Sequence, residues 1–188
     1  MKHLLILAFL AFTVVSCNDK AATTTTGEKP ADSVVTAAEA PAETLEYAYT
    51  LDKPYRDWQP GDKKHAVMVM KSLKAYEDGD IANCVTAFAD TVDLRFDRFF
   101  ARISNDSLKK MFTANRANFT STKVHMNDWE SVISKDKKDE YVTLWYKEIS
   151  TDKKGKTDSI SVVDDLKIVN GKIAEIDQKI QHFPTKKM

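Results

Sequence analysis

One acidic residue, Asp164, stands in an otherwise apolar row of the sequence. Alternating positions of the segment 157–169 share one face of a predicted strand: Ile160, Val162, Asp164, Leu166 and Ile168. A carboxyl group among apolar side chains loses its hydration, which raises its pKa and suits it to act as an acid or hydrogen-bond donor. Asp164 is therefore the candidate for ligand contact or acid chemistry. The alternative is a structural carboxylate bonded to the backbone or to a basic side chain.

Three aromatic residues on the neighbouring predicted strands are candidate ligand contacts: Trp129, Tyr141 and Trp145. Aromatic side chains on strands are more often part of a core, which is the alternative for all three. Both faces of the predicted strand 140–150 carry large apolar groups. One face should therefore line the interior, and the other should meet a second copy of the domain or the segment that precedes the domain.

Other chemistry finds little support in the sequence. His65, His125 and His182 have no metal-ligand spacing, and Cys84 lies on an apolar helical stripe without an activating neighbour. We find no glycine-rich phosphate-binding motif, and we expect no metal and no cofactor. The chain has 28 basic and 28 acidic side chains, so it lacks the basic excess that nucleic-acid binding favours.

The amino terminus is typical of an exported protein. Lys2 precedes an apolar run from Leu4 to Val15, which is shorter than the roughly 20 residues of a membrane-spanning helix. The run ends in Val14-Val15-Ser16-Cys17, which resembles the bacterial lipobox. Residues 1–16 are therefore predicted to be a lipoprotein signal peptide, with Cys17 as the lipidation site. This predicts a protein of the bacterial cell envelope, anchored to a membrane by its lipid, with the domain outside the cytoplasm.

Composition divides the remaining chain into three parts. Residues 17–44 are rich in Ala, Thr and Glu and lack large apolar side chains, which predicts a flexible tether. Residues 45–61 contain several aromatic residues together with Pro54, Pro60 and Gly61, which predicts an extended arm lying on the domain or, alternatively, a partner-binding peptide. Residues 62–184 form the predicted domain.

The domain shows helical periodicity first and strand periodicity afterwards. A helix is predicted after Asp62 and is ended by Gly79; a second covers 81–88, and a third begins near residues 104–106. A short strand over 92–96 lies between the last two helices. Four long strands are predicted after the helices, over 123–134, 140–150, 157–169 and 172–183, with a hairpin signal at Asn170-Gly171. This order indicates an α+β domain.

Three local motifs in this order resemble the nuclear transport factor 2-like superfamily, especially its SnoaL-like members. They are the helix-to-helix turn EDGDI at 77–81, the strand start FADTV at 88–92, and the closing hairpin DDLKIVNGKI at 164–173. The resemblance implies a cone-shaped, curved antiparallel sheet with three N-terminal helices packed on its concave side, and a pocket between them. In ketosteroid isomerase-like relatives, a protonated Asp at the place of Asp164 helps to hold an oxyanion. Asp97 lies near the position of their base, but Phe96 is better aligned with it.

The sequence leaves three functions open. The first is a membrane-anchored module that binds a small apolar or weakly polar ligand in the cone, with Asp164 as its polar contact. The second is an isomerase, cyclase or hydratase that uses Asp164. The third is a homodimeric interaction module that uses the aromatic arm and the outer face of the sheet. Because this superfamily contains enzymes and non-catalytic members, the fold does not decide among them.

Overall fold

The computed structural model describes residues 46–97 and 99–183. The chain divides at residue 48, and all described helices and strands belong to the unit Tyr49–Met188. The buried hydrophobic residues lie between Ala66 and Ile176, so this unit contains a complete core of its own. The predicted signal peptide, Cys17 and the tether over 17–44 lie outside the described residues.

The first helix, α1 (Lys63–Asp78), has the boundaries that its capping residues predict. The Asp62 carboxylate accepts a hydrogen bond from the backbone N–H of Lys64 at 2.8 Å. Gly79 ends the helix in the left-handed conformation, with φ of 83°, which glycine adopts without steric cost. The predicted apolar face is confirmed, since Ala66 and Val69 are buried.

The second predicted helix is much shorter than its periodicity indicated. Helix α2 covers only Ile81–Cys84 and continues as a 3₁₀ turn, η1 (Val85–Ala87), before strand β2 begins at Phe88. The prediction of a helix through Phe88 was therefore wrong. Phe88 is buried, but as the first residue of a strand, and a buried strand start fits the same apolar spacing.

Seven strands form one sheet in the order β1-β4-β5-β6-β7-β2-β3. The four long strands are confirmed, with these bounds: β4 (Phe119–Ile133), β5 (Glu140–Asp152), β6 (Thr157–Val169) and β7 (Lys172–His182). Strand β2 (Phe88–Phe96) pairs antiparallel with β3 (Phe99–Ser104) and parallel with β7. The sheet is thus mostly antiparallel, with one parallel pair, and the short strands β1 (Gln59–Pro60) and β3 were not predicted.

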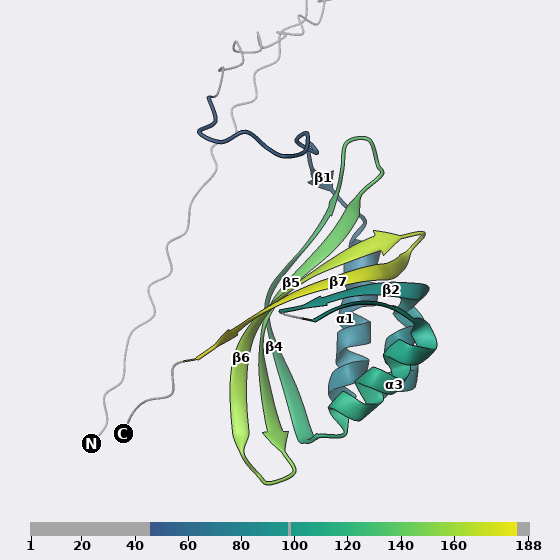
Figure 1. Ribbon diagram of the computed structural model, residues 1–188, viewed down its shortest axis with the longest axis vertical. Coiled ribbons are helices and arrows are strands. Elements are labelled where there is room, and N and C mark those ends of the chain that lie inside the picture. Colours follow the sequence, from purple (N-terminus) through teal and green to yellow (C-terminus); the bar gives the residue numbers. More distant parts are fainter. Residues whose placement is uncertain (1–45, 98, 184–188) are drawn as a thin grey trace, which may run out of the picture. The chain divides into compact units, whose positions relative to one another are not determined.

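The sheet is curved and open, and α1 and α3 (Asn105–Arg116) lie on its concave side (Figure 1). The predicted α+β architecture is confirmed, and α3 follows the predicted short strand, which the structure extends to the β2–β3 hairpin. The core is formed where the helices meet the inward faces of the long strands, as at Leu108, Val142 and Leu144. No described helix is long and apolar enough to cross a membrane.

The segment predicted as an aromatic arm contacts the sheet at its carboxyl end. Strand β1 pairs with the end of β4, and the ring of Trp58 packs edge-on against Tyr141 at 5.8 Å between ring centroids. The Arg56 guanidinium lies 3.1 Å from the Asp139 carboxylate. Tyr49, Leu51 and Tyr55 are exposed. The sheet edge therefore orders residues 56–60, whereas the apolar side chains before them contribute little to the core.

Candidate functional site: a buried carboxyl group in an apolar pocket

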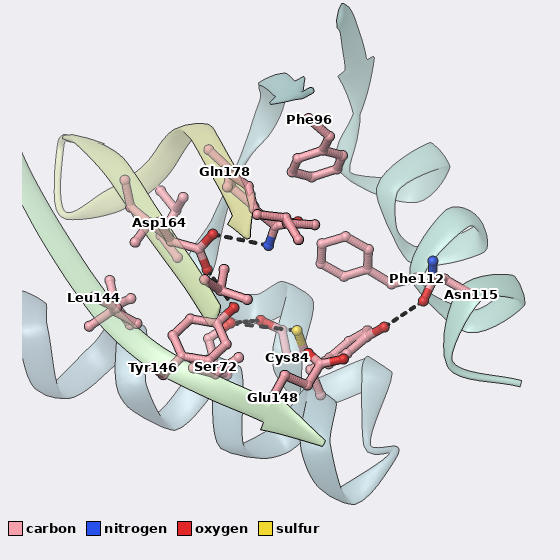
Figure 2. A pocket seen from close by; sticks show the side chains of 18 of the residues that line it. Ser72, Cys84, Phe96, Phe112, Asn115, Leu144, Tyr146, Glu148, Asp164 and Gln178 are labelled. Carbon is pink, nitrogen blue, oxygen red and sulfur yellow. Dashed lines mark hydrogen bonds between the residues drawn. The ribbon is translucent and has the colours of Figure 1, made fainter. Parts of the chain in front are cut away.

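A pocket of about 440 Å³ lies between the two longer helices and the concave face of the sheet. Its walls are largely apolar and come from α1, α2, α3 and strands β2 and β4 to β7. The lining includes aromatic and aliphatic residues: Val69, Leu73, Tyr76, Phe88, Phe96, Met111, Phe112, Phe119, Leu144, Ile160, Val162, Leu166, Ile173, Ile176 and Ile180. Phe96 and Phe112 point into this space from opposite elements (Figure 2). We call this cavity the Asp164 pocket.

Asp164 lies on β6 with its side chain turned into the pocket, and the residue is 6% exposed. The Tyr146 hydroxyl donates to Asp164 Oδ2 at 2.8 Å, and the Gln178 side-chain amide donates to Oδ1 at 3.0 Å (Figure 2). Burial raises the pKa of the Asp164 carboxyl to about 6, although the two hydrogen bonds act in the opposite direction. The negative charges of Glu148 and Asp165 add to the rise in this pKa.

A β-bulge decides which residue of β7 stands beside Asp164. Close to the Asn170-Gly171 turn, Ile168 of β6 pairs with Ile173 of β7. The preceding residue of β6, Lys167, pairs with Glu175, so the register shifts by one residue. As a result, Asp164 pairs with Gln178. Without the bulge, the same hairpin would place Asp177 opposite Asp164, and two carboxylates would meet where an amide now donates a hydrogen bond.

The other polar groups of the pocket are paired within the protein. The Tyr76 hydroxyl donates to Asn115 Oδ1 at 2.7 Å, and the Ser72 hydroxyl donates to the Cys84 carbonyl at 2.8 Å. Burial raises the pKa of the Cys84 thiol and raises that of Tyr76 to about 12. Burial and the neighbouring Asp164 charge also raise the pKa of Tyr146. Tyr76, Tyr146 and the Cys84 thiol are therefore neutral near neutral pH.

The three aromatic residues predicted as ligand contacts do not line the pocket. Tyr141 and Trp145 alternate with the buried Leu144, so they lie on the outer face of β5, half-buried. Trp129 pairs with Leu144 across the β4–β5 ladder and packs against the core outside the pocket. For Tyr141 and Trp145 the strand face decides this placement, whereas Trp129 shares the face of Leu144 but lies beyond the pocket lining. The aromatic walls of the pocket come instead from the helices, from the ends of β2 and β4, and from Tyr146 on the inward face of β5.

Asp97 takes no part in the pocket. It lies in the β2–β3 turn with φ of 47° and is exposed, whereas Phe96 lines the pocket. This agrees with the register expected from the sequence. Within 46–97 and 99–183, no group of three His, Cys, Asp or Glu side chains is arranged to hold a metal ion. Asp164 is thus the buried acid of the pocket, and its hydrogen-bonding partners are Tyr146 and Gln178.

Sequence reasoning missed both partners of Asp164. Tyr146 was predictable as a neighbour, because it shares the face of Leu144 on the adjacent strand. Gln178 was not, since the bulge that shifts its register leaves no distinct signal in the sequence. The helices contribute mostly apolar residues at helical spacing, such as Leu73 and Phe112, and this spacing does not distinguish a pocket wall from a core.

Comparison with known proteins supports the fold. No protein-family model matches the chain, and no curated protein matches it either. Among solved structures, AusH from Aspergillus nidulans is 16% identical with a TM-score of 0.53, and the match covers 65% of this chain and 87% of that one. A nuclear transport factor 2-like protein from Anabaena variabilis is 14% identical with a TM-score of 0.52, over 64% and 90% of the two chains.

A third similar structure is that of SalBIII, described as an epoxide hydrolase/cyclase-like enzyme of pyran ring formation in salinomycin. It is 15% identical, with a TM-score of 0.53 over 63% of this chain and 92% of that one. At these identities the similarity establishes the architecture. The described domain therefore has the nuclear transport factor 2-like fold, in agreement with the three sequence motifs.

Proposed function

We propose that this domain binds a small, largely apolar ligand in the Asp164 pocket. The observation that carries the proposal is a pocket of about 440 Å³ with apolar walls and one deeply buried carboxyl group. Ligand sites typically have volumes of roughly 300–1,000 Å³ and combine apolar walls with a few polar groups that fix the orientation of the ligand. Burying a carboxyl group costs free energy unless it is fully hydrogen-bonded, so a partly bonded one beside an open pocket suggests a functional group with room for a ligand.

The amino-terminal segment supports a location for the domain at a membrane. We infer from the lipobox-like motif that Cys17 is lipidated, so that residues 18–44 tether the domain to a membrane of the bacterial envelope. Anchoring would hold the pocket close to a bilayer, in which apolar molecules concentrate. A carrier or sensor of such molecules fits this placement.

Binding of a neutral apolar fluorophore, N-phenyl-naphthylamine, to residues 18–188 tests the proposal. Val162 lines the pocket, and its neighbour Val163 faces the outer side of the same strand, so Val162→Phe and Val163→Phe form a matched pair. We expect Val162→Phe to weaken binding by roughly tenfold or more and Val163→Phe to leave it unchanged, because only the first fills the cavity. Equal binding by both variants would refute the pocket as the site.

Val162 is almost fully buried, so a larger residue there could disturb folding as well as the pocket. A second variant is therefore needed to test whether the ligand binds in the pocket. Ile160 lines the pocket but is only partly buried, so Ile160→Phe fills the space with less strain on the core. We expect the same loss of fluorophore binding, together with a circular dichroism spectrum unchanged from that of the wild type. Retained binding in Ile160→Phe would also count against the proposal.

A catalytic function is the second candidate, and one observation favours it. The Asp164 carboxyl has a pKa of about 6 and accepts a hydrogen bond from the Tyr146 hydroxyl, so it can give up or take up a proton near neutral pH. An isomerase, cyclase or hydratase needs such a group facing its substrate. If a substrate is found, Asp164→Asn should abolish turnover while binding persists. Turnover that survives this change would exclude Asp164 as the acid or base.

A further inference from the structure

The charged groups that line the Asp164 pocket are all of one sign. Asp164 and Glu148 both face the cavity, and no Lys, Arg or His occurs among its lining residues. The nearby Arg116 guanidinium acts electrostatically on Tyr76 but does not line the cavity, and it donates to the backbone carbonyls of Glu77 and Phe119 at 3.1 and 3.0 Å. Within the described part of the chain, the pocket is therefore a negatively charged, otherwise apolar cavity.

The hydrogen bonds to Asp164 leave its charge without a cationic partner. Tyr146 and Gln178 are both neutral donors, and each bonds to one carboxylate oxygen. An ionised carboxylate accepts up to about four hydrogen bonds, so about half of this capacity remains for a ligand. Buried charges in proteins are normally paired, and a cation entering the pocket would complete such a pair.

The aromatic walls of the pocket also favour a ligand that carries a positive charge. Phe96 and Phe112 face the cavity from β2 and α3, and Tyr76 lines it from α1. The faces of aromatic rings attract cations and also pack against hydrocarbon. A molecule with an apolar body and one positive group would therefore meet favourable surfaces throughout the pocket.

We propose that the ligand of this pocket is a hydrophobic primary amine, bound with its ammonium group on Asp164 and its hydrocarbon body against Phe96 and Phe112. This inference rests on the proposed binding function and names the chemical class of its ligand. An anionic ligand such as a fatty acid is disfavoured because it would place a further negative charge beside the Asp164 and Glu148 carboxyl groups in a poorly solvated space. A ligand that offers only a carbonyl would bind only after Asp164 takes up a proton, because an ionised carboxylate cannot donate a hydrogen bond to it.

The inference predicts how pH changes the affinity. With a pKa of about 6, Asp164 is roughly nine-tenths ionised at pH 7 and attracts an ammonium group; the attraction is lost as the pH falls through 6. The titratable groups facing Asp164 are Tyr146 and Glu148 from β5, with Tyr76 and Cys84 from the helices; Gln178 on β7 does not titrate. On its own strand, Asp165 lies on the opposite face.

The test compares three molecules that share one hydrocarbon body: cyclohexylmethylamine, cyclohexylmethanol and cyclohexanecarboxylate. Calorimetric titration of residues 18–188 near pH 7.5 should show the amine binding roughly tenfold or more tighter than the alcohol, and no binding of the carboxylate. Lowering the pH to about 5 should remove the preference for the amine, because Asp164 is then mostly protonated.

Two variants assign the preference to Asp164. Asp164→Asn should lose the preference for the amine over the alcohol. Asp165→Asn, which makes the same change one residue away on the outer face, should keep that preference. Tighter binding of the alcohol or the carboxylate than of the amine would overturn the inference and leave the binding function standing. If none of the three molecules binds while the fluorophore still binds in the pocket, the inference fails and the binding function stands; if the fluorophore does not bind either, both proposals fail.

Discussion

The raised pKa of Asp164 predicts that Asp164→Asn will gain stability relative to the wild type as the pH rises. In the folded protein this pKa is raised from the ordinary value of 3.8 to about 6. The folded state therefore holds the proton more tightly than the unfolded state. Protonated Asp164 contributes its full stability below pH 3.8, and this contribution is lost as the pH rises through 6. At 1.36 kcal/mol per pKa unit, the loss is about 3 kcal/mol near pH 7.5.

Asp164→Asn removes the titration and keeps the shape of the side chain. The amide oxygen still accepts from the Tyr146 hydroxyl, and the Gln178 amide can rotate to accept from the new NH₂ group. Relative to the wild type, the free energy of unfolding of this variant should increase by about 2 kcal/mol between pH 4.5 and pH 7.5. This value is smaller than 3 kcal/mol because the unfolded chain is already largely ionised at pH 4.5.

Urea unfolding of residues 18–188, followed by tryptophan fluorescence at several pH values, measures this difference. Asp165→Asn is the matched control: its carboxylate bonds to Thr143 and Lys179 on the outer face. That variant should be less stable than the wild type by at most about 1 kcal/mol, as is usual for exposed ion pairs. If Asp164→Asn gained no stability relative to the wild type with rising pH, the carboxyl group would be solvated, and the pocket argument would fail.

Three further predictions concern other parts of the chain. Cys17→Ala should abolish incorporation of labelled palmitate in a bacterial host, and labelling that persists would refute the lipid anchor. Residues 18–188 should form a dimer in light scattering, and Trp145→Glu, on the half-buried outer face of β5, should convert it to a monomer; a monomeric wild type would refute the homodimer. Gly79→Ala should lower the free energy of unfolding by about 1 kcal/mol in urea, because Gly79 has φ of 83°, and an unchanged value would contradict the role of this helix cap.

The sequence predicted those parts of the fold that local rules determine. Asp62 and Gly79 mark the ends of α1 because a side-chain cap and a left-handed glycine leave a clear signal. The long strands and the Asn170-Gly171 turn were visible from alternation and turn chemistry. The inward position of Asp164 followed from the same alternation, because β6 keeps a regular pleat through this residue.

The parts that the sequence did not predict depend on tertiary contacts. Strand β3 begins with two large apolar residues, Phe99 and Phe100, which are both exposed, so exposed and half-buried residues alternate only over the short stretch that follows. Phe88 continues a helical spacing but begins β2, since burial alone does not distinguish the two structures. Tyr141 and Trp145 are aromatic enough for a ligand site, yet β5 turns them outward.

The most direct test of the account is the titration of the Asp164 carboxyl carbon by NMR, first in the free protein and then with saturating cyclohexylmethylamine. The Asp164 carboxyl should titrate with a pKa near 6 in the free protein, because burial disfavours the charged form, and with a lower pKa in the amine complex, because an ammonium group stabilises that form. A pKa near 3.8 that the amine does not change would contradict the account.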